Sequence, residues 1–204
     1  MRRSAILTAA CLLAAFGACV PSLHPLYTEK DLIADPALLG IWTGEDEKER
    51  WRFTQDGPTA YKLVYIDKES RDSEFSIHIL KLGGATFLDF YPGDVKIPQN
   101  DFFKAHLLRA HLFLRVTLTS DSLQMSLMKP DWLLNTLKEK PGLIKHEIVE
   151  DRVILTAPTG DLQKFIIDNL KTKDVFTEPV KLKRLSKDDI KPGKPVSIAP
   201  PAGF

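Results

Sequence analysis

Apolar and polar side chains alternate over much of the middle of this 204-residue chain, and this period of two is typical of strands with one buried face. The runs are rich in β-branched and aromatic residues, and residues that favour turns lie between them. The pattern predicts about nine or ten strands. They cover residues 39–42, 51–55, 59–67, 74–82, 86–91, 112–118, 123–127 and 179–185, with a hairpin over 146–156.

The clearest turn joins the predicted strands at 74–82 and 86–91. Gly83 and Gly84 stand there, and paired glycines accept the positive φ angles that a tight two-residue hairpin turn requires. Asp121-Ser122 separates a second pair of alternating runs in the same way. Successive strands joined by short turns lie side by side, so the sequence predicts an antiparallel meander.

Two short helices are predicted late in the chain, where the apolar spacing changes to that of a helix. Residues 130–140 start at a proline, which suits a first helical turn. Residues 159–171 carry one apolar face, with Thr159 as the predicted N-cap. Because open strand edges invite association, the strands are expected to close into a barrel or to pack as a two-layer sandwich. The predicted fold class is therefore mainly β, with a minor α+β component.

The first nineteen residues have the features of an export signal. Arg2 and Arg3 form a positive start, and the apolar run from Ala5 to Phe16 is too short to remain in a bilayer as a spanning helix. The small residues that lead into Cys19 resemble the lipobox of bacterial lipoproteins. That family usually has leucine three residues before the cysteine, where this chain has Phe16.

The resemblance implies that residues 1–18 are removed and that Cys19 becomes the lipidated first residue of the mature protein. Acyl chains on Cys19 would anchor the protein to a membrane of the bacterial cell envelope. Val20 stands where an aspartate commonly retains lipoproteins in the inner membrane, so an outer-membrane location follows if the host has one. Two alternatives stay open. One is an ordinary cleaved signal peptide, and the other is Cys11, which would leave a much shorter apolar run.

The rest of the chain divides into three parts. Residues 19–36 combine prolines with apolar side chains and are expected to be a tether that packs near the domain. Residues 37–186 are expected to form a single β-rich domain, and residues 187–204 a mobile tail rich in proline. Cys19 is the only cysteine after residue 18, so no disulfide is expected.

Charge excludes one class of partner. Without Arg2 and Arg3, the basic residues fall from 28 to 26, against 27 acidic residues. A protein that binds nucleic acid usually presents a strong excess of positive charge. The sequence therefore predicts no nucleic-acid partner.

One short motif bears on the kind of barrel. Gly40-Ile41-Trp42 opens the first predicted strand and resembles the Gly-x-Trp motif of lipocalin-like and related calycin barrels. The resemblance implies that Trp42 plugs one end of the barrel, and the alternative is that Trp42 is simply a buried strand aromatic. The two late helices depart from a simple lipocalin, which has a single terminal helix.

Residues that could carry chemistry form no complete motif. The segment from His146 is similar to the start of a zinc-protease motif, but Glu150 replaces the second histidine and the segment is predicted to be a strand. His106 and His111 are expected at the surface or at an interface. The acidic residues Glu45, Asp46, Glu47 and Glu49 are interleaved with Lys48 and Arg50, which is typical of a solvated loop. The sequence therefore predicts no enzyme, no catalytic residue, no metal site and no cofactor.

Two larger sets of side chains each allow two interpretations. The basic residues near the end of the chain meet anionic lipid headgroups or guard an edge strand: Lys181, Lys183, Arg184 and Lys187. The aromatic residues of the first strands are core, or they line a cavity if the barrel is wide: Trp51, Phe53, Tyr61, Tyr65, Phe75, Phe87, Phe90 and Tyr91.

Two functional hypotheses follow. The first is a lipid-anchored extracytoplasmic binding module that holds an apolar small molecule or lipid in its barrel. The alternative is an envelope interaction or assembly lipoprotein with a filled core, which holds a protein partner through its helices, the region of Tyr27 or the tail. No ligand-binding residue is assigned, because periodicity shows which residues face inward and not how much space they leave.

Overall fold

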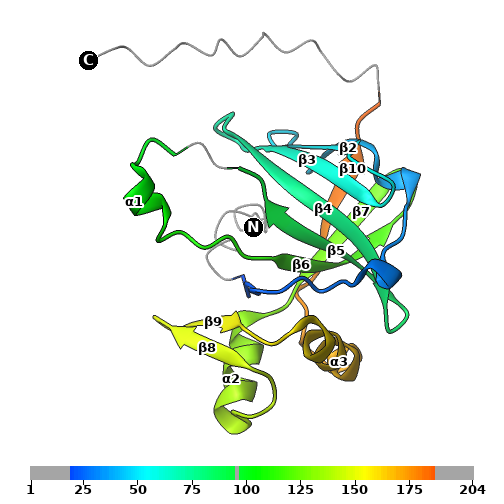
Figure 1. Cartoon of the computed structure of the whole chain (residues 1–204). Coiled ribbons are helices and arrows are strands. Elements are labelled where there is room, and N and C mark those ends of the chain that lie inside the picture. The colour runs from blue at the N-terminus through cyan, green and yellow to red at the C-terminus, as the bar shows by residue number, and fades with distance from the viewer. Residues whose placement is uncertain (1–18, 95–96, 187–204) are drawn as a thin grey trace, which may run out of the picture.

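The computed structural model describes residues 19–94 and 97–186, and eight of its strands close into an antiparallel barrel (Figure 1). Seven strands follow one another around the barrel as a meander, and β10 closes the circle between β7 and β1. The mainly β fold is thereby confirmed, with the barrel as its form. The barrel strands are β1 (Gly40–Thr43), β2 (Arg50–Gln55), β3 (Ala60–Ile66), β4 (Asp72–Leu82), β5 (Ala85–Pro92), β6 (Leu112–Leu118), β7 (Ser122–Leu127) and β10 (Val180–Arg184).

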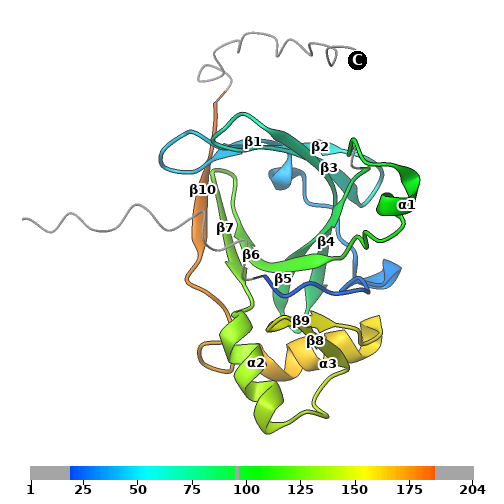
Figure 2. The ribbon, with the colours of Figure 1, turned by 90° about the vertical axis from the view of Figure 1, so that its left-hand side faces the viewer.

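The residues between β7 and β10 form a second layer along one side of the barrel (Figures 1 and 2). Leu80 and Phe87 lie on the outer face of β4 and β5, and they share a buried cluster with Leu133 and Phe165 of the second layer. The two late helices are as predicted. The elements of this layer are α2 (Pro130–Glu139), β8 (His146–Val149), β9 (Arg152–Leu155) and α3 (Thr159–Asn169).

Residues 19–36 run between the two layers as a strap. Ser22 forms backbone bridges with His111 on one side and with Leu155 on the other. Two 3-10 turns follow, η2 (Glu29–Asp31) and η3 (Pro36–Leu38). The predicted signal and the predicted tail lie outside the described residues.

The turn between β4 and β5 forms as predicted. Gly83 and Gly84 have φ angles of 57° and 80°, and Leu82 pairs with Ala85 across them. The position of Gly83 has a second constraint, because a Cβ atom there would lie 2.6 Å from Leu170 Cδ1. The hairpin end therefore packs closely against the end of α3.

Two local predictions differ from the structure. The N-cap of α3 is Pro158 and not Thr159, whose hydroxyl donates instead to the carbonyl oxygen of Pro25 in the strap, at 2.8 Å. The short helix α1 (Asp101–Lys104) has no counterpart in the sequence pattern, because one turn does not show a helical period. Its N-cap signal is present, since Asn100 accepts the backbone N–H of Phe103.

Candidate functional site

The barrel interior is packed with apolar side chains over much of its length. Six of the aromatic residues singled out in the sequence belong to this packing: Trp51, Phe53, Tyr61 and Phe90 as buried members, with Tyr65 and Phe75 against them. Phe87 faces the second layer instead, and the ring of Tyr91 lies outside the barrel, 4.5 Å from that of His111. A packed interior leaves the ends of the barrel as the places where a ligand could enter.

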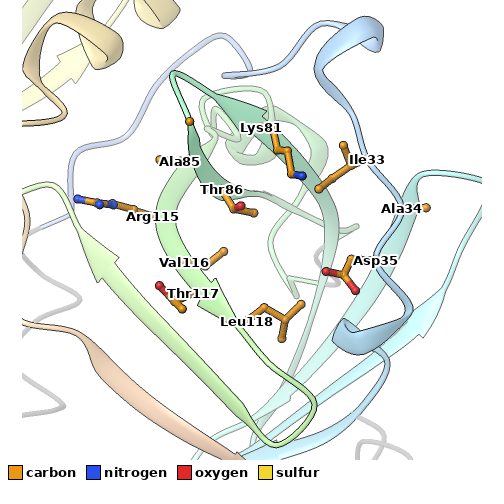
Figure 3. A pocket seen from close by; sticks show the side chains of 11 residues that line it. Ile33, Ala34, Asp35, Lys81, Ala85, Thr86, Arg115, Val116, Thr117 and Leu118 are labelled. Atoms are coloured by element: carbon orange, nitrogen blue, oxygen red, sulfur yellow. The ribbon is translucent and has the colours of Figure 1, made fainter.

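A hollow of about 580 Å³ opens at the end where β4 turns into β5 (Figure 3). The strap, the β4–β5 hairpin and β6 form its walls. Its apolar lining includes Ile33, Val116 and Leu118, and its polar lining includes Asp35, Lys81 and Thr86. Binding sites for small molecules combine these two kinds of lining, and their volumes are commonly about 300–1,000 Å³.

Lys81 and Thr86 reach this hollow because of the hairpin register. They pair with each other across β4 and β5, two residues beyond the pair of Ile79 and Leu88. Ile79 and Leu88 are fully buried inside the barrel, and alternate residues of a strand face the same side. Lys81 and Thr86 therefore continue the inner face to the rim.

Three charged residues line this hollow, Asp35, Lys81 and Arg115, and they differ in how firmly they are held. The guanidinium carbon of Arg115 lies 5.8 Å from the centre of the Phe176 ring. Asp35 accepts the backbone N–H of Ala37 at 3.0 Å, and its own N–H donates to the Tyr61 hydroxyl at 2.8 Å. The Lys81 ammonium makes no hydrogen bond or ion pair with any residue of the described ranges, 19–94 and 97–186. An anionic group that enters the hollow can therefore pair with Lys81 without displacing an existing partner.

Trp42 and Arg184 brace η3 at this end of the barrel. The Trp42 ring is fully buried, and its Nε1–H donates to the carbonyl oxygen of Leu38 at 2.9 Å. The guanidinium carbon of Arg184 lies 4.2 Å from the centre of that ring, and the group donates to the carbonyl oxygens of Ala37 and Leu39. A cation over an aromatic face is stabilised by the ring quadrupole.

This brace explains the glycine of the Gly-x-Trp motif. Gly40 has a φ of 127°, and a Cβ atom at this position would lie 2.5 Å from Arg184 Nη1. That φ angle is one that residues with a side chain rarely adopt, and a Cβ atom would in addition displace the guanidinium.

The basic residues of β10 do not guard an edge strand. β10 pairs with β7 on one side and β1 on the other, so that interpretation is wrong. Lys183 Nζ lies 2.5 Å from Glu47 Oε1, and Lys187 lies outside the described residues. In the acidic loop, Glu49 is buried rather than solvated, since the exposed fraction of its side chain is 6% and Lys68 Nζ lies 3.8 Å away.

Four aromatic side chains gather inside the barrel where β2, β3, β4 and β5 meet. The Trp51 ring lies 4.7 Å from that of Tyr65 and 6.4 Å from that of Phe90, which also meets Phe75 edge to face at 6.3 Å. Burial and the nearby Glu49 carboxylate raise the pKa of the Tyr65 hydroxyl. Trp51 Nε1 is buried with no acceptor among the described residues, so a donor remains open here.

A buried polar cluster on the outer face of the barrel was not foreseen from the sequence. Asp89 is fully buried, with Oδ1 2.7 Å from His111 Nδ1, and its Oδ2 accepts the backbone N–H of Leu26 at 2.8 Å. His78 pairs with Asp89 across the strands and stacks on Tyr27 at 4.3 Å. The cluster therefore fastens the strap to the barrel. Its sequence signal is a carboxylate within the apolar run of β5.

Acid is expected to weaken this attachment. Burial lowers the pKa of His78, Asp89 opposes this shift and His111 adds to it. The folded state therefore binds fewer protons on His78 than the unfolded state does. The contribution of His78 to the free energy of unfolding is fully present above its ordinary pKa of about 6.5 and is lost as the pH falls below that value. Urea unfolding at about pH 7.5 and about pH 5 measures the difference.

The matched controls for this prediction are two glutamine variants. His78→Gln removes the group, so its free energy of unfolding should fall less between the two pH values than that of the parent. His24→Gln removes an exposed histidine and should behave like the parent. An equal fall in all three proteins contradicts the role of His78.

The remaining candidate residues are scattered. His146 opens β8 with Nδ1 2.8 Å from the carbonyl oxygen of Ile144, and Glu150 lies in the β8–β9 turn with a φ of 50°. No group of three or more His, Cys, Asp or Glu side chains in the described part of the chain is placed to hold a metal ion. Cys19 lies beside Arg152, and burial raises the pKa of its thiol while that arginine lowers it.

No known protein family, no characterised protein and no solved structure matches the chain. Within residues 19–94 and 97–186, none of the helices has the length and apolar character needed to cross a membrane. The geometry of the barrel and of its open end is therefore the basis for the function of this protein.

Proposed function

We propose that this protein is a lipid-anchored binding module of the bacterial envelope, which holds an amphipathic small molecule at the open end of its barrel. One observation carries the proposal. The hollow of about 580 Å³ joins an apolar lining to the unpaired ammonium of Lys81 at its rim.

The lining favours a ligand with two parts. Ile33, Val116 and Leu118 offer an apolar surface, and removing apolar surface from water contributes roughly 25 cal/mol per Å². Lys81 offers a cation for a carboxylate or phosphate group at the rim. Thr86 adds a hydroxyl that donates or accepts a hydrogen bond.

The packed interior favours the second candidate function, an interaction lipoprotein with a filled core. Fifteen buried side chains, from Leu38 to Leu182, form the interior cluster. This packing restricts the proposed ligand to the open end. It equally suits a barrel that serves as a rigid support for a protein partner.

Ligand binding is tested on the chain from residue 20 onward, secreted behind a non-lipid signal peptide and purified without detergent. We expect native mass spectrometry to detect a bound compound that leaves on denaturation. Titration with hexadecanoate and hexadecanol then asks whether the anionic group matters, and hexadecanoate should bind more tightly because it alone can pair with Lys81.

Lys81→Glu is the matching variant. It should weaken hexadecanoate binding by about tenfold, because a charge-assisted hydrogen bond contributes ~1.5–3 kcal/mol and solvent at the rim screens part of it. Lys138→Glu on α2 is the control with the same charge change, and it should bind like the parent. If the parent binds neither probe and carries no compound, the filled-core function replaces this one.

A further inference from the structure

Among the described residues, the two large apolar side chains with the highest exposed fractions lie in the loop between β5 and β6. Phe102 and Leu108 are 80% and 82% exposed, and Phe103 and Leu107 are about half exposed on the same loop. Clusters of large apolar side chains are rare on a soluble surface, and they commonly mark contacts with a protein or a membrane.

Residues 97–111 of this loop are structured without contacts that bury these side chains. Asn100 caps α1, and His106 Nδ1 lies 2.8 Å from the carbonyl oxygen of Phe102. The loop's charges pair with neighbouring charges, since Lys104 lies 3.4 Å from Asp101 and Arg109 lies 3.0 Å from Asp94. The paired charges leave no excess of negative charge that an anionic lipid surface would repel.

The start of the strap lies next to this loop. The loop ends at His111, whose backbone exchanges hydrogen bonds of 2.8 and 2.9 Å with Ser22, three residues after Cys19. On its other side the strap pairs with β9, so Cys19 lies beside Arg152 at the β8–β9 turn.

The β8–β9 hairpin carries a second exposed apolar pair on the same side of the molecule. Ile148 and Val149 are each about half exposed, and Val149 pairs with Arg152. Figure 1 shows α1 and the tip of this hairpin as the two projections on its left, and Figure 2 looks onto that side. Both apolar projections therefore lie on one side of the molecule, as the neighbours of the segment that begins at Cys19.

We propose that the loop at 97–111 inserts Phe102 and Leu108 into the surface of the lipid bilayer, with the β8–β9 tip as a second contact. This inference rests on the proposed function, because the anchor on Cys19 would hold the loop at that surface. A bilayer suits it better than a protein, because Figure 1 shows that the loop projects from the barrel. A fluid lipid surface adapts to such a projection, whereas a protein partner needs a matching hollow.

The contact would also orient the binding site. β5 begins at the hollow, beside Gly84, and ends at the apolar loop, after Pro92. The two therefore lie at opposite ends of the barrel. With the loop in the bilayer, the hollow faces the aqueous compartment, so a ligand reaches it from water rather than from the supporting membrane.

The test places a tryptophan in the loop of the full chain, purified from the bacterial envelope and reconstituted in phosphatidylethanolamine and phosphatidylglycerol vesicles that contain brominated lipid. Apolar side chains at an interface are buried ~5–10 Å into the boundary between headgroups and acyl chains, where brominated lipid quenches tryptophan, so Phe102→Trp should lose much of the emission that it adds to the parent. Thr54→Trp, exposed on β2, is the matched control and should lose none. Adding Leu108→Asp to Phe102→Trp should abolish the loss.

Three results overturn the inference. They are no quenching of Phe102→Trp, equal quenching of Phe102→Trp and Thr54→Trp, or an emission shift of Phe102→Trp that accompanies dimer formation without vesicles. An acyl label measured on the same samples separates the two proposals. Label without quenching removes the loop contact alone, whereas quenching without label removes the anchor and supports the loop.

Discussion

Replacing Cys19 by serine is expected to abolish acyl labelling of this protein and to remove most of it from the membrane fraction. Each buried methylene of an acyl chain contributes about 0.8 kcal/mol, so several chains give an attachment that washing does not reverse. Serine keeps the size of the side chain and cannot form the thioether. Metabolic labelling with a clickable fatty acid, followed by fractionation of the cells, measures both effects.

Cys11→Ser is the matched control, because it removes the other cysteine of the chain. It should keep both the label and the membrane attachment. If Cys19→Ser keeps its label while Cys11→Ser loses it, the acylated residue is Cys11. If neither substitution changes the label, neither cysteine alone carries the acyl chains, and the proposed anchor fails.

Replacing Trp42 by alanine is expected to lower the free energy of unfolding by about 3–5 kcal/mol, the range for large aromatic side chains removed from a core. The ring is fully buried, it carries the Arg184 guanidinium on one face, and it donates to Leu38. Its removal leaves a cavity and also releases η3 from the end of the barrel. Denaturant unfolding followed by circular dichroism measures the loss.

Trp132→Ala provides the comparison. Trp132 is only partly buried on α2, in the second layer, so its loss should be clearly smaller. The effect on the hollow separates the two sites further, because Trp42→Ala should also weaken hexadecanoate binding through η3 and Asp35. A loss below about 1 kcal/mol for Trp42→Ala, the size of an average substitution, would contradict its role as a brace.

The strap connects the proposed anchor with the proposed binding site. It begins at Cys19, is fastened to Asp89 through the backbone of Leu26, and supplies Ile33 and Asp35 to the wall of the hollow. A change at the membrane end can therefore reach the site through one continuous segment. The acid sensitivity expected from His78 acts on the same attachment.

Most strands of the barrel could be predicted from the local pattern of apolar and polar residues. The period of two along 112–118 and 123–127 predicts which residues face inward, and Leu114, Val116, Leu123 and Met125 are indeed buried there. Gly83-Gly84 predicts the hairpin because only local φ angles decide that turn. The prediction of Thr159 as an N-cap was wrong, because its hydroxyl donates to the carbonyl oxygen of Pro25 in the strap, which is far away in sequence.

The candidate site was much harder to predict from the sequence. Lys81 is the last residue but one of β4 and has the sequence context of an ordinary surface lysine. The register with Thr86 nevertheless places it on the rim of a hollow. His111 was expected at a surface or an interface, and it contacts a buried carboxylate that lies 22 residues earlier in the chain. Pairings of this kind depend on which strands become neighbours, and no short window of sequence contains that information.

The sequence by itself determined the strands, the tight turns and the two late helices, because backbone propensity and the spacing of apolar residues act over a few neighbouring positions. Only the tertiary structure decided that the meander closes with β10, that the strap lies between two layers, and that Asp35, Lys81 and Val116 meet around one opening. Closure depends on strand tilt and register around the whole barrel, and the size of the opening depends on how every interior side chain packs.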